Sequence, residues 1–363
     1  MKNEQKPEAC MASFISANSQ DGFFSLYDEV FAPQKFDKIF IITGGPGTGK
    51  STLLRKIYAE ALSWNCESEQ ILCSSDPGSL DGVILNANGH RIGILDGTPP
   101  HGRIPSYPAV TEEIIHLGLL WNAPKLQKSK DDIFALTDTK KHAYRSAYML
   151  LRALGSIEEE ERLRFLPYFD EEKATRQIKH RLQAERKKGE QKRRFLRAIC
   201  SQGEFILPFA EKDVKNLILV GGKESSAETY LSLFAKAVAT ETLEHTVYLS
   251  PIRPEIPDAI YLPQSQTLLI KERLAQHKDK GRRIVADRFF SVSGCESKDL
   301  AREKQQLQNA VISRLAEAAS AHRAMEALYS GAMDFSRFDD LLKAVIHNVF
   351  SLLYPSCMVK EES

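Results

Sequence analysis

The sequence lacks the features that would place it at once in a specialised class of protein. No hydrophobic run approaches the length of about eighteen residues that a transmembrane helix needs. The start of the chain also lacks the charged-then-apolar pattern of a secretory signal. The six cysteines show no CxxC pair and no histidine-paired metal spacing, which is typical of free thiols in a reducing cytosol. We therefore expect a cytoplasmic protein that has no membrane partner.

Excess charge of either sign is also lacking. The chain has 49 Lys and Arg against 48 Asp and Glu, so its formal net charge is +1, and no overall field draws it to nucleic acid. One stretch, residues 171–195, is locally basic, but it also contains glutamates and has no interleaved aromatic residues. We expect it to be a solvated helix that ends the first unit, rather than a nucleic-acid-binding helix. Nucleic acid is therefore not the favoured partner.

What the sequence does contain is a phosphate-binding loop. Residues 38–43, KIFIIT, form an apolar run that predicts a buried parallel strand, and LLRKIYAEAL (53–62) has helical periodicity. Between them lies GGPGTGKST, which matches G-x-x-x-x-G-K-[ST] in the strand–helix context that this motif requires. A glycine-rich turn that merely caps a helix would not need the Gly-Lys-Ser triplet. The pattern therefore predicts a P-loop.

Each residue type in this loop has a physical role. Glycines let the backbone curl so that its amides converge on phosphate, and the start of the helix adds a positive dipole end. Lys50 is expected to reach the β- and γ-phosphates of ATP or GTP, and the Ser51 hydroxyl to bind Mg²⁺. The predicted nucleotide-binding residues are Gly44, Gly45, Pro46, Gly47, Thr48, Gly49, Lys50, Ser51 and Thr52.

The chain also repeats itself. Residues 215–239 resemble 38–62, so that Gly221 and Gly222 fall on Gly44 and Gly45. Upstream, residues 14–22 resemble 195–203, and a long helical stretch closes each half, at about 138–164 and 300–330. For 363 residues this predicts two related units, 12–192 and 193–355. Each is expected to be an α/β P-loop NTPase unit, with a mostly parallel sheet flanked by helices.

The second copy has lost the residues that carry the chemistry. Lys50 corresponds to Ala227, which cannot neutralise phosphate. Ser51 corresponds to Glu228, which puts a carboxylate where the Mg²⁺-binding hydroxyl belongs. The second unit is therefore degenerate and is not expected to bind nucleotide in the usual way.

Two aspartates lie in a polar loop that follows a predicted strand, in residues 69–81. The carboxyl end of a parallel strand is where ligands bind in open α/β folds. Asp76 becomes Arg253 in the second copy, which makes Asp76 a candidate catalytic residue. Asp81 recurs as Asp258, which favours a turn-forming role.

A third aspartate, Asp96, ends a predicted hairpin in residues 82–101. Apolar residues followed by Asp form the Walker B pattern, in which the carboxylate holds Mg²⁺ through water. Asp96 is thus expected to join Ser51 at the metal, with a structural turn residue as the alternative, and its counterpart is taken as Glu272. Gly97 follows it, so the base that would activate water is not identified. His101 has a counterpart in His277, which favours a packing role, with proton transfer as the alternative.

These motifs resemble an uncharacterised bacterial family of tandem P-loop proteins, whose members are labelled ATPase or nucleotide kinase. The resemblance covers nearly the whole chain and is carried by FISANSQDGFFSLYDEV, IFIITGGPGTGKST, CSSDPGSLDGVI, ILDGTPPH, EEIIHLGLLW and AMDF. In that family the second unit often has its own intact P-loop, and this sequence departs there with GGKESSAET. The resemblance implies the fold and ATP binding, and it implies no particular substrate.

The leading hypothesis is a P-loop ATPase with one competent Mg²⁺-nucleotide site. Lys50, Asp96 and Asp76 are its candidate catalytic residues. A small-molecule or nucleotide kinase is the first alternative, in which the polar loop would bind an acceptor. The second is an ATP-dependent switch with little turnover, which binds a partner protein or nucleic acid through its helices.

Overall fold

The computed structural model describes residues 11–208, 214–276, 280–292 and 298–355, and they form two compact units. The first unit combines residues 1–15, 25–144 and 315–363, and the second combines 16–24 and 145–314. Each unit therefore contains segments from both halves of the sequence. Within the described residues, no helix is both long and apolar enough to cross a membrane.

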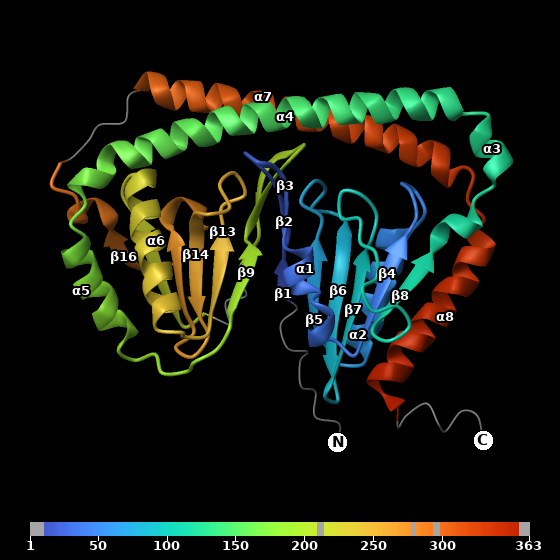
Figure 1. The fold of residues 1–363 in the computed structure, drawn as a ribbon, viewed down its shortest axis with the longest axis horizontal. Coiled ribbons are helices and arrows are strands. Elements are labelled where there is room, and N and C mark those ends of the chain that lie inside the picture. Colours follow the sequence, from blue (N-terminus) through green and yellow to red (C-terminus); the bar gives the residue numbers. More distant parts are fainter. Residues whose placement is uncertain (1–10, 209–213, 277–279, 293–297, 356–363) are drawn as a thin grey trace. The chain divides into compact units, whose positions relative to one another are not determined.

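The first unit is built on a six-stranded mixed sheet (Figure 1). Its strands, in spatial order, are β1 (Met11–Ser13), β5 (Glu67–Leu72), β6 (Leu80–Ala87), β7 (His90–Asp96), β4 (Lys38–Thr43) and β8 (Glu112–His116). The pairs β1–β5, β4–β7 and β4–β8 are parallel, and the hairpin strand β6 is antiparallel to both of its neighbours. The hairpin predicted from the sequence is thus confirmed. Its turn residues, Asn88 and Gly89, both have positive φ, as a tight two-residue turn requires.

Two helices cover one face of this sheet. α2 (Lys50–Ser63) and α8 (Phe335–Leu353) bury apolar side chains such as Ile57 and Val349 against Phe40 and Ile42 of β4. On that strand Ile39 and Ile41 alternate with these residues and are also fully buried. A strand that is buried on both faces reads as a continuous apolar run, which is why KIFIIT was recognisable in the sequence.

The second unit repeats this topology. Its strands, in the matching spatial order, are β9 (Gln191–Phe195), β13 (His245–Leu249), β14 (Pro257–Leu262), β15 (Thr267–Lys271), β12 (Asn216–Gly221) and β16 (Arg282–Val285). The helices α5 (Glu171–Leu182) and α6 (Glu224–Thr240) pack over it. The predicted α/β class, with mostly parallel sheets flanked by helices, is confirmed.

Short elements complete the two units. Outside the large sheets are the hairpins β2 (Ser16–Ser19) with β3 (Gly22–Ser25) and β10 (Arg197–Cys200) with β11 (Gly203–Ile206), and the short helices α1 (Tyr27–Val30) and α3 (Ala123–Gln127). Asn18 of β2 donates to the carbonyl of Ile199 in β10, so both hairpins meet within the second unit.

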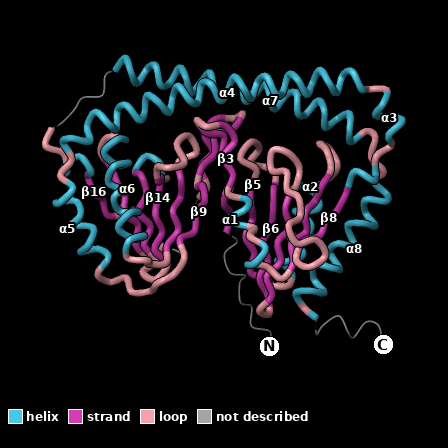
Figure 2. The backbone as a smooth tube through the Cα atoms, in the orientation of Figure 1, coloured by secondary structure: helices cyan, strands magenta, loops and turns pink. Residues whose placement is uncertain are grey.

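Two long helices each contribute to both units. α4 (Lys130–Phe165) gives its residues up to Tyr144 to the first unit, and α7 (Lys298–Ser330) gives its residues from Leu315 onward. Both are continuous helices along the tube in Figure 2. Within the first unit they are in contact, since Thr137 Oγ1 lies 3.3 Å from Met325 Sδ. The end of α7, which comes from the second half of the sequence, is therefore part of the unit that contains the predicted P-loop.

One sequence expectation about helices is wrong. Residues 171–195 do not form a single solvated helix, because α5 ends at Leu182 and Gln191–Phe195 is strand β9. The helix is also not fully solvated, since Ala174 and Ile178 are buried in the core of the second unit. β9 lies at the edge of its sheet, where Lys and Arg are common because they discourage pairing with another chain.

Candidate functional site

The candidate site lies at the carboxyl end of β4. The strand ends at Thr43 and α2 begins at Lys50, as the sequence predicted. The six residues between them form the loop, in which Gly47 (φ +67°) and Gly49 (φ +87°) adopt left-handed conformations that other residues rarely take. Gly49 is the N-cap of α2, so the curled loop passes directly into the positive end of a 14-residue helix.

The backbone amides of this loop are available to a ligand. Within the described part of the chain, no amide of residues 47–52 donates a hydrogen bond, and the ladder of α2 starts with Leu53 N donating to Gly49 O. Unpaired amides at a helix start are expected, but a whole turn preceded by further unpaired loop amides forms an anion-binding concavity. The predicted phosphate-binding residues are thus brought together in one loop.

Lys50 lies across this loop. Its Nζ atom donates to the carbonyl oxygens of Gly44 (3.0 Å) and Gly45 (2.8 Å), and it lies 3.7 Å from Asp96 Oδ2. The ammonium group is only slightly exposed and has neutral carbonyls as its nearest partners. Such a charge can move to phosphate oxygens at little cost, because no strong ion pair must be broken first.

Asp96 lies beside the loop because β7 runs parallel to β4. The ladder places Asp96 opposite Ile42, at the end of the strand adjacent to the P-loop strand. Its Oδ1 atom accepts from the amide (2.8 Å) and hydroxyl (2.6 Å) of Thr98, and its Oδ2 faces Lys50. Burial raises the pKa of Asp96, and the positive charge of Lys50 partly offsets that rise.

The second-copy counterpart of Asp96 is not the residue expected from the sequence. Val220 takes the place of Ile42, since both side chains lie in the core against the helices, and the residue opposite Val220 in β15 is Lys271. Glu272 lies beyond the end of the strand and pairs with Arg283 at 2.7 Å. The expectation of Glu272 at this position is therefore wrong, and the second unit has the Lys271 cation where the first unit has the Asp96 carboxylate.

The polar loop between β5 and β6 contacts helix α2. Ser51 Oγ accepts from the amide of Leu80 at 3.2 Å, and Arg55 donates to the carbonyl of Gly78 at 2.6 Å. A hydroxyl oxygen has two acceptor lone pairs, so Ser51 retains one for a metal ion. Asp76 is exposed at the tip of this loop.

Asp81 is not the turn-forming residue expected from the sequence. It lies within strand β6 and is buried, with Oδ2 3.1 Å from His101 Nε2. The His101 ring stacks on Tyr27, with centroids 4.5 Å apart. The packing role expected for His101 is therefore observed, together with a carboxylate partner that the sequence did not reveal. His277, which was taken as its counterpart, lies outside the described residues.

Helix α7 brings further charged groups to the loop. A Cβ atom on Gly47 would lie 2.5 Å from the backbone oxygen of Glu326, so this turn of α7 rests on the loop itself. His322 Nε2 lies 3.6 Å from Glu326 Oε1. Burial and the charges of Lys140 and Lys50 lower the pKa of His322 to about 4, whereas burial and the charge of Asp76 raise the pKa of Glu326. Sequence reasoning missed these residues because they come from the other half of the chain.

The loop glycines therefore have a second role in packing. A Cβ atom on Gly45 would lie 3.0 Å from the Trp121 ring, and one on Gly49 would lie 2.8 Å from the Phe338 ring. Contacts this close leave no room for a side chain. Gly45, Gly47 and Gly49 thus allow the residues after β8, the end of α7 and the start of α8 to approach the loop.

The second unit has no equivalent loop. β12 ends at Gly221 and α6 already begins at Glu224, so only two residues join strand to helix. Asp287 Oδ1 accepts from the amide of Lys223 at 3.0 Å, and a Cβ on Gly222 would lie 2.8 Å from the same oxygen. A carboxylate of the protein therefore occupies the helix start, where the first unit offers unpaired amides.

Buried ion pairs occupy the space next to the start of α6. Lys271 Nζ lies 3.1 Å from Glu228 Oε1 and 2.9 Å from Asp258 Oδ1, and all three side chains are almost completely buried. Arg253, the counterpart of Asp76, pairs with Glu228, and Arg197 pairs with Asp258 at 2.6 Å. The pKa values of Lys271 and Arg197 are raised by these carboxylates, against the opposing effect of burial. The predicted carboxylate at position 228 is thus neutralised by the protein itself.

Comparison of the chain with protein-family models, with curated proteins and with solved structures gave no match. The function proposed below therefore rests on the residues and the geometry described above.

Proposed function

We propose that the protein binds ATP or GTP with Mg²⁺ through residues 44–52 of the first unit and hydrolyses it. The observation that carries the proposal is the arrangement of three parts at the end of one strand. These parts are the unpaired amides of residues 47–52, the Lys50 ammonium and the Asp96 carboxylate of the adjacent parallel strand. Convergent amides, a mobile cation and a carboxylate one strand away are the parts that P-loop phosphate chemistry uses.

The oxygen donors present suit magnesium. Mg²⁺ is bound through one or two protein oxygens, with phosphates and water completing its octahedron. The Ser51 hydroxyl at the start of α2 and the Asp96 carboxylate at the end of β7 would supply these oxygens. When bound, the metal ion neutralises charge on the phosphates.

The role of Lys50 can be tested directly. Calorimetry with ATP or GTP and Mg²⁺ should show saturable binding to the wild-type chain, and Lys50→Ala should abolish it. Lys56→Ala is the matched control, because Lys56 lies six residues along the same helix and is exposed. Release of phosphate by the wild type and not by Lys50→Ala would support hydrolysis. Unchanged affinity in Lys50→Ala would exclude the P-loop assignment.

Transfer to a small acceptor is the second candidate function. It is favoured by the polar groups that interact electrostatically with Lys50, namely Lys140, His322 and Glu326, the last two of which also interact with Asp76. Carboxylates near a terminal phosphate would suit an acceptor hydroxyl as well as they suit water. Formation of ADP or GDP that depends on an added acceptor would favour a kinase, whereas its formation without one would favour hydrolysis.

A further inference from the structure

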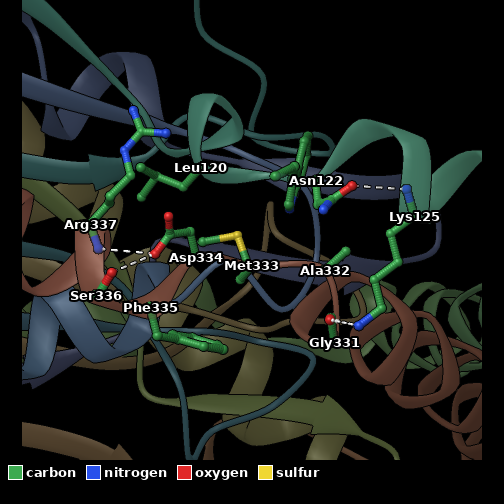
Figure 3. Close-up of a pocket in the computed structure, with 11 residues that line it drawn as sticks. Leu120, Asn122, Lys125, Gly331, Ala332, Met333, Asp334, Phe335, Ser336 and Arg337 are labelled. Carbon is green, nitrogen blue, oxygen red and sulfur yellow. Dashed lines mark hydrogen bonds between the residues drawn. The ribbon is translucent and has the colours of Figure 1, made fainter.

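An open cavity of about 610 Å³ lies in the first unit, between two segments (Figure 3). One segment, residues 120–125, follows β8 and enters α3, and the other, residues 331–337, comprises the turn between α7 and α8 and the first residues of α8. The amide of Asn122 donates to Ala332 O at 2.8 Å and the amide of Asp334 donates to Leu120 O at 2.9 Å, so the two segments are clamped together. This volume is within the usual range of small-molecule sites.

The cavity adjoins the P-loop at two points. Trp121, which lines it, has its ring where a side chain of Gly45 would be. Phe338, one residue beyond the cavity-lining Arg337, touches Gly49 in the same way. The cavity also lies on the β8 side of β4, whereas Asp96 and the expected metal ion lie on the β7 side. A molecule held by its phosphates on the loop thus has this cavity beside it, away from the metal ion.

The lining combines flat apolar surface with charge. Trp121, Met333 and Phe335 provide apolar surface, and Phe335, the first residue of α8, is 51% exposed. Among the described residues, none accepts a hydrogen bond from the Arg337 guanidinium. Aromatic rings and guanidinium planes are the groups on which nucleic-acid bases stack.

We infer that this cavity receives the purine nucleoside of the nucleotide whose phosphates lie on the P-loop. The inference rests on the proposed function, since the loop must hold the phosphates for the tethered nucleoside to reach the cavity. The base would stack on Phe335, and the Arg337 cation would lie against the base or the ribose oxygens. Both side chains are exposed, so both are accessible to a ligand, and the Phe335 ring also packs edge-on against Phe338.

Calorimetry with three ligands in the presence of Mg²⁺ tests the inference: ATP, GTP and inorganic tripolyphosphate. Wild type should bind at least one purine nucleotide about tenfold or more tightly than tripolyphosphate. Phe335→Ala should weaken that nucleotide by about tenfold, as expected for loss of one stacking contact. It should leave tripolyphosphate unchanged, because that ligand has no base. Phe134→Ala is the matched control, since Phe134 is equally exposed (58%) but lies on α4.

The possible results separate this inference from the proposed function. Equal wild-type affinity for tripolyphosphate and for both nucleotides would overturn the cavity assignment while leaving the P-loop in place. An unchanged nucleotide affinity in both Phe335→Ala and Arg337→Gln would overturn it in the same way. If wild type binds none of the three ligands, the proposed function fails and this inference fails with it.

Discussion

Lys271 Nζ lies 3.1 Å from Glu228 Oε1, at the place in the second unit where the first unit has the Mg²⁺-binding candidate Ser51. Because Lys271 is already paired with Glu228, it leaves no free positive charge for phosphate there. The start of α6 is also occupied, because Asp287 Oδ1 accepts from the amide of Lys223 at 3.0 Å and would repel a phosphate placed there. We therefore predict one nucleotide per chain. Equilibrium titration of the wild type should saturate at that ratio, and a second saturable site would contradict it.

The same ion pairs should be important for the stability of the second unit. Lys271→Met removes the cation and leaves Glu228 and Asp258 buried together without it. Breaking a buried pair in this way costs about 3–5 kcal/mol, so the urea midpoint should fall sharply. Lys236→Met on the exposed face of α6 is the control and should change little. Equal midpoints for the two variants would mean that the network adds nothing to stability.

Acid should weaken the second unit through its carboxylates. Burial tends to raise the pKa of Asp258, but Arg197 and Lys271 hold it well below its usual value, and Lys271 and Arg273 likewise bring that of Glu224 to about 2. A carboxylate whose pKa is depressed on folding stabilises the fold above its unfolded pKa, and this contribution is lost as the pH falls through the folded pKa. Glu158 acts in the opposite direction, because burial raises its pKa.

The expected outcome is a free energy of unfolding that falls as the pH is lowered from about 5 towards 2. Urea unfolding at several pH values measures it, with tyrosine and tryptophan fluorescence as the signal. Lys271→Met should flatten this dependence, because the cation that depresses both pKa values is gone. The same slope in the variant and in wild type would show that other groups cause the acid sensitivity.

The local parts of the P-loop could be predicted from the sequence because they depend on neighbouring residues only. The predicted strand 38–43 and the predicted helix start at Lys50 are both confirmed, because a continuous apolar run ends where the glycines begin. The groups around the loop could not be predicted. Glu326 and Phe338 are almost three hundred residues away along the chain, and helical periodicity does not indicate which sheet a helix covers.

The degenerate copy shows the same division. The sequence showed that Ala227 stands at the position that corresponds to Lys50, and that Glu228 brings a carboxylate to the next position. The pairing of Glu228 with Lys271 depends on how β15 aligns with β12, and a comparison of repeats does not fix that register. The shortened loop was also missed, because the alignment without gaps placed the start of α6 at Ala227, whereas the helix begins at Glu224.

Asp96 provides the last prediction, which concerns magnesium. In Asp96→Asn the carboxylate that would hold Mg²⁺ is replaced by an amide of the same size. We expect metal-free nucleotide affinity to stay nearly unchanged, while the gain in affinity on adding Mg²⁺ falls by about tenfold, the effect expected for one oxygen ligand or its water-mediated equivalent. Magnesium titrations at fixed nucleotide concentration measure this gain, and curves that overlay those of wild type would leave Asp96 as a structural residue.

The pH dependence of the same titration gives a sharper test of the carboxylate. Burial raises the pKa of Asp96, so protonation begins at a higher pH than for an exposed aspartate. Only the ionised form binds the metal ion. The magnesium gain of wild type should therefore shrink at a higher pH than for a site with an exposed aspartate, whereas Asp96→Asn, which has no proton to take up, should show little change. The positive charge of Lys50 partly offsets the rise in the pKa of Asp96. If the magnesium gain of wild type shrinks only below the pKa of an exposed aspartate, Lys50 outweighs burial at this site.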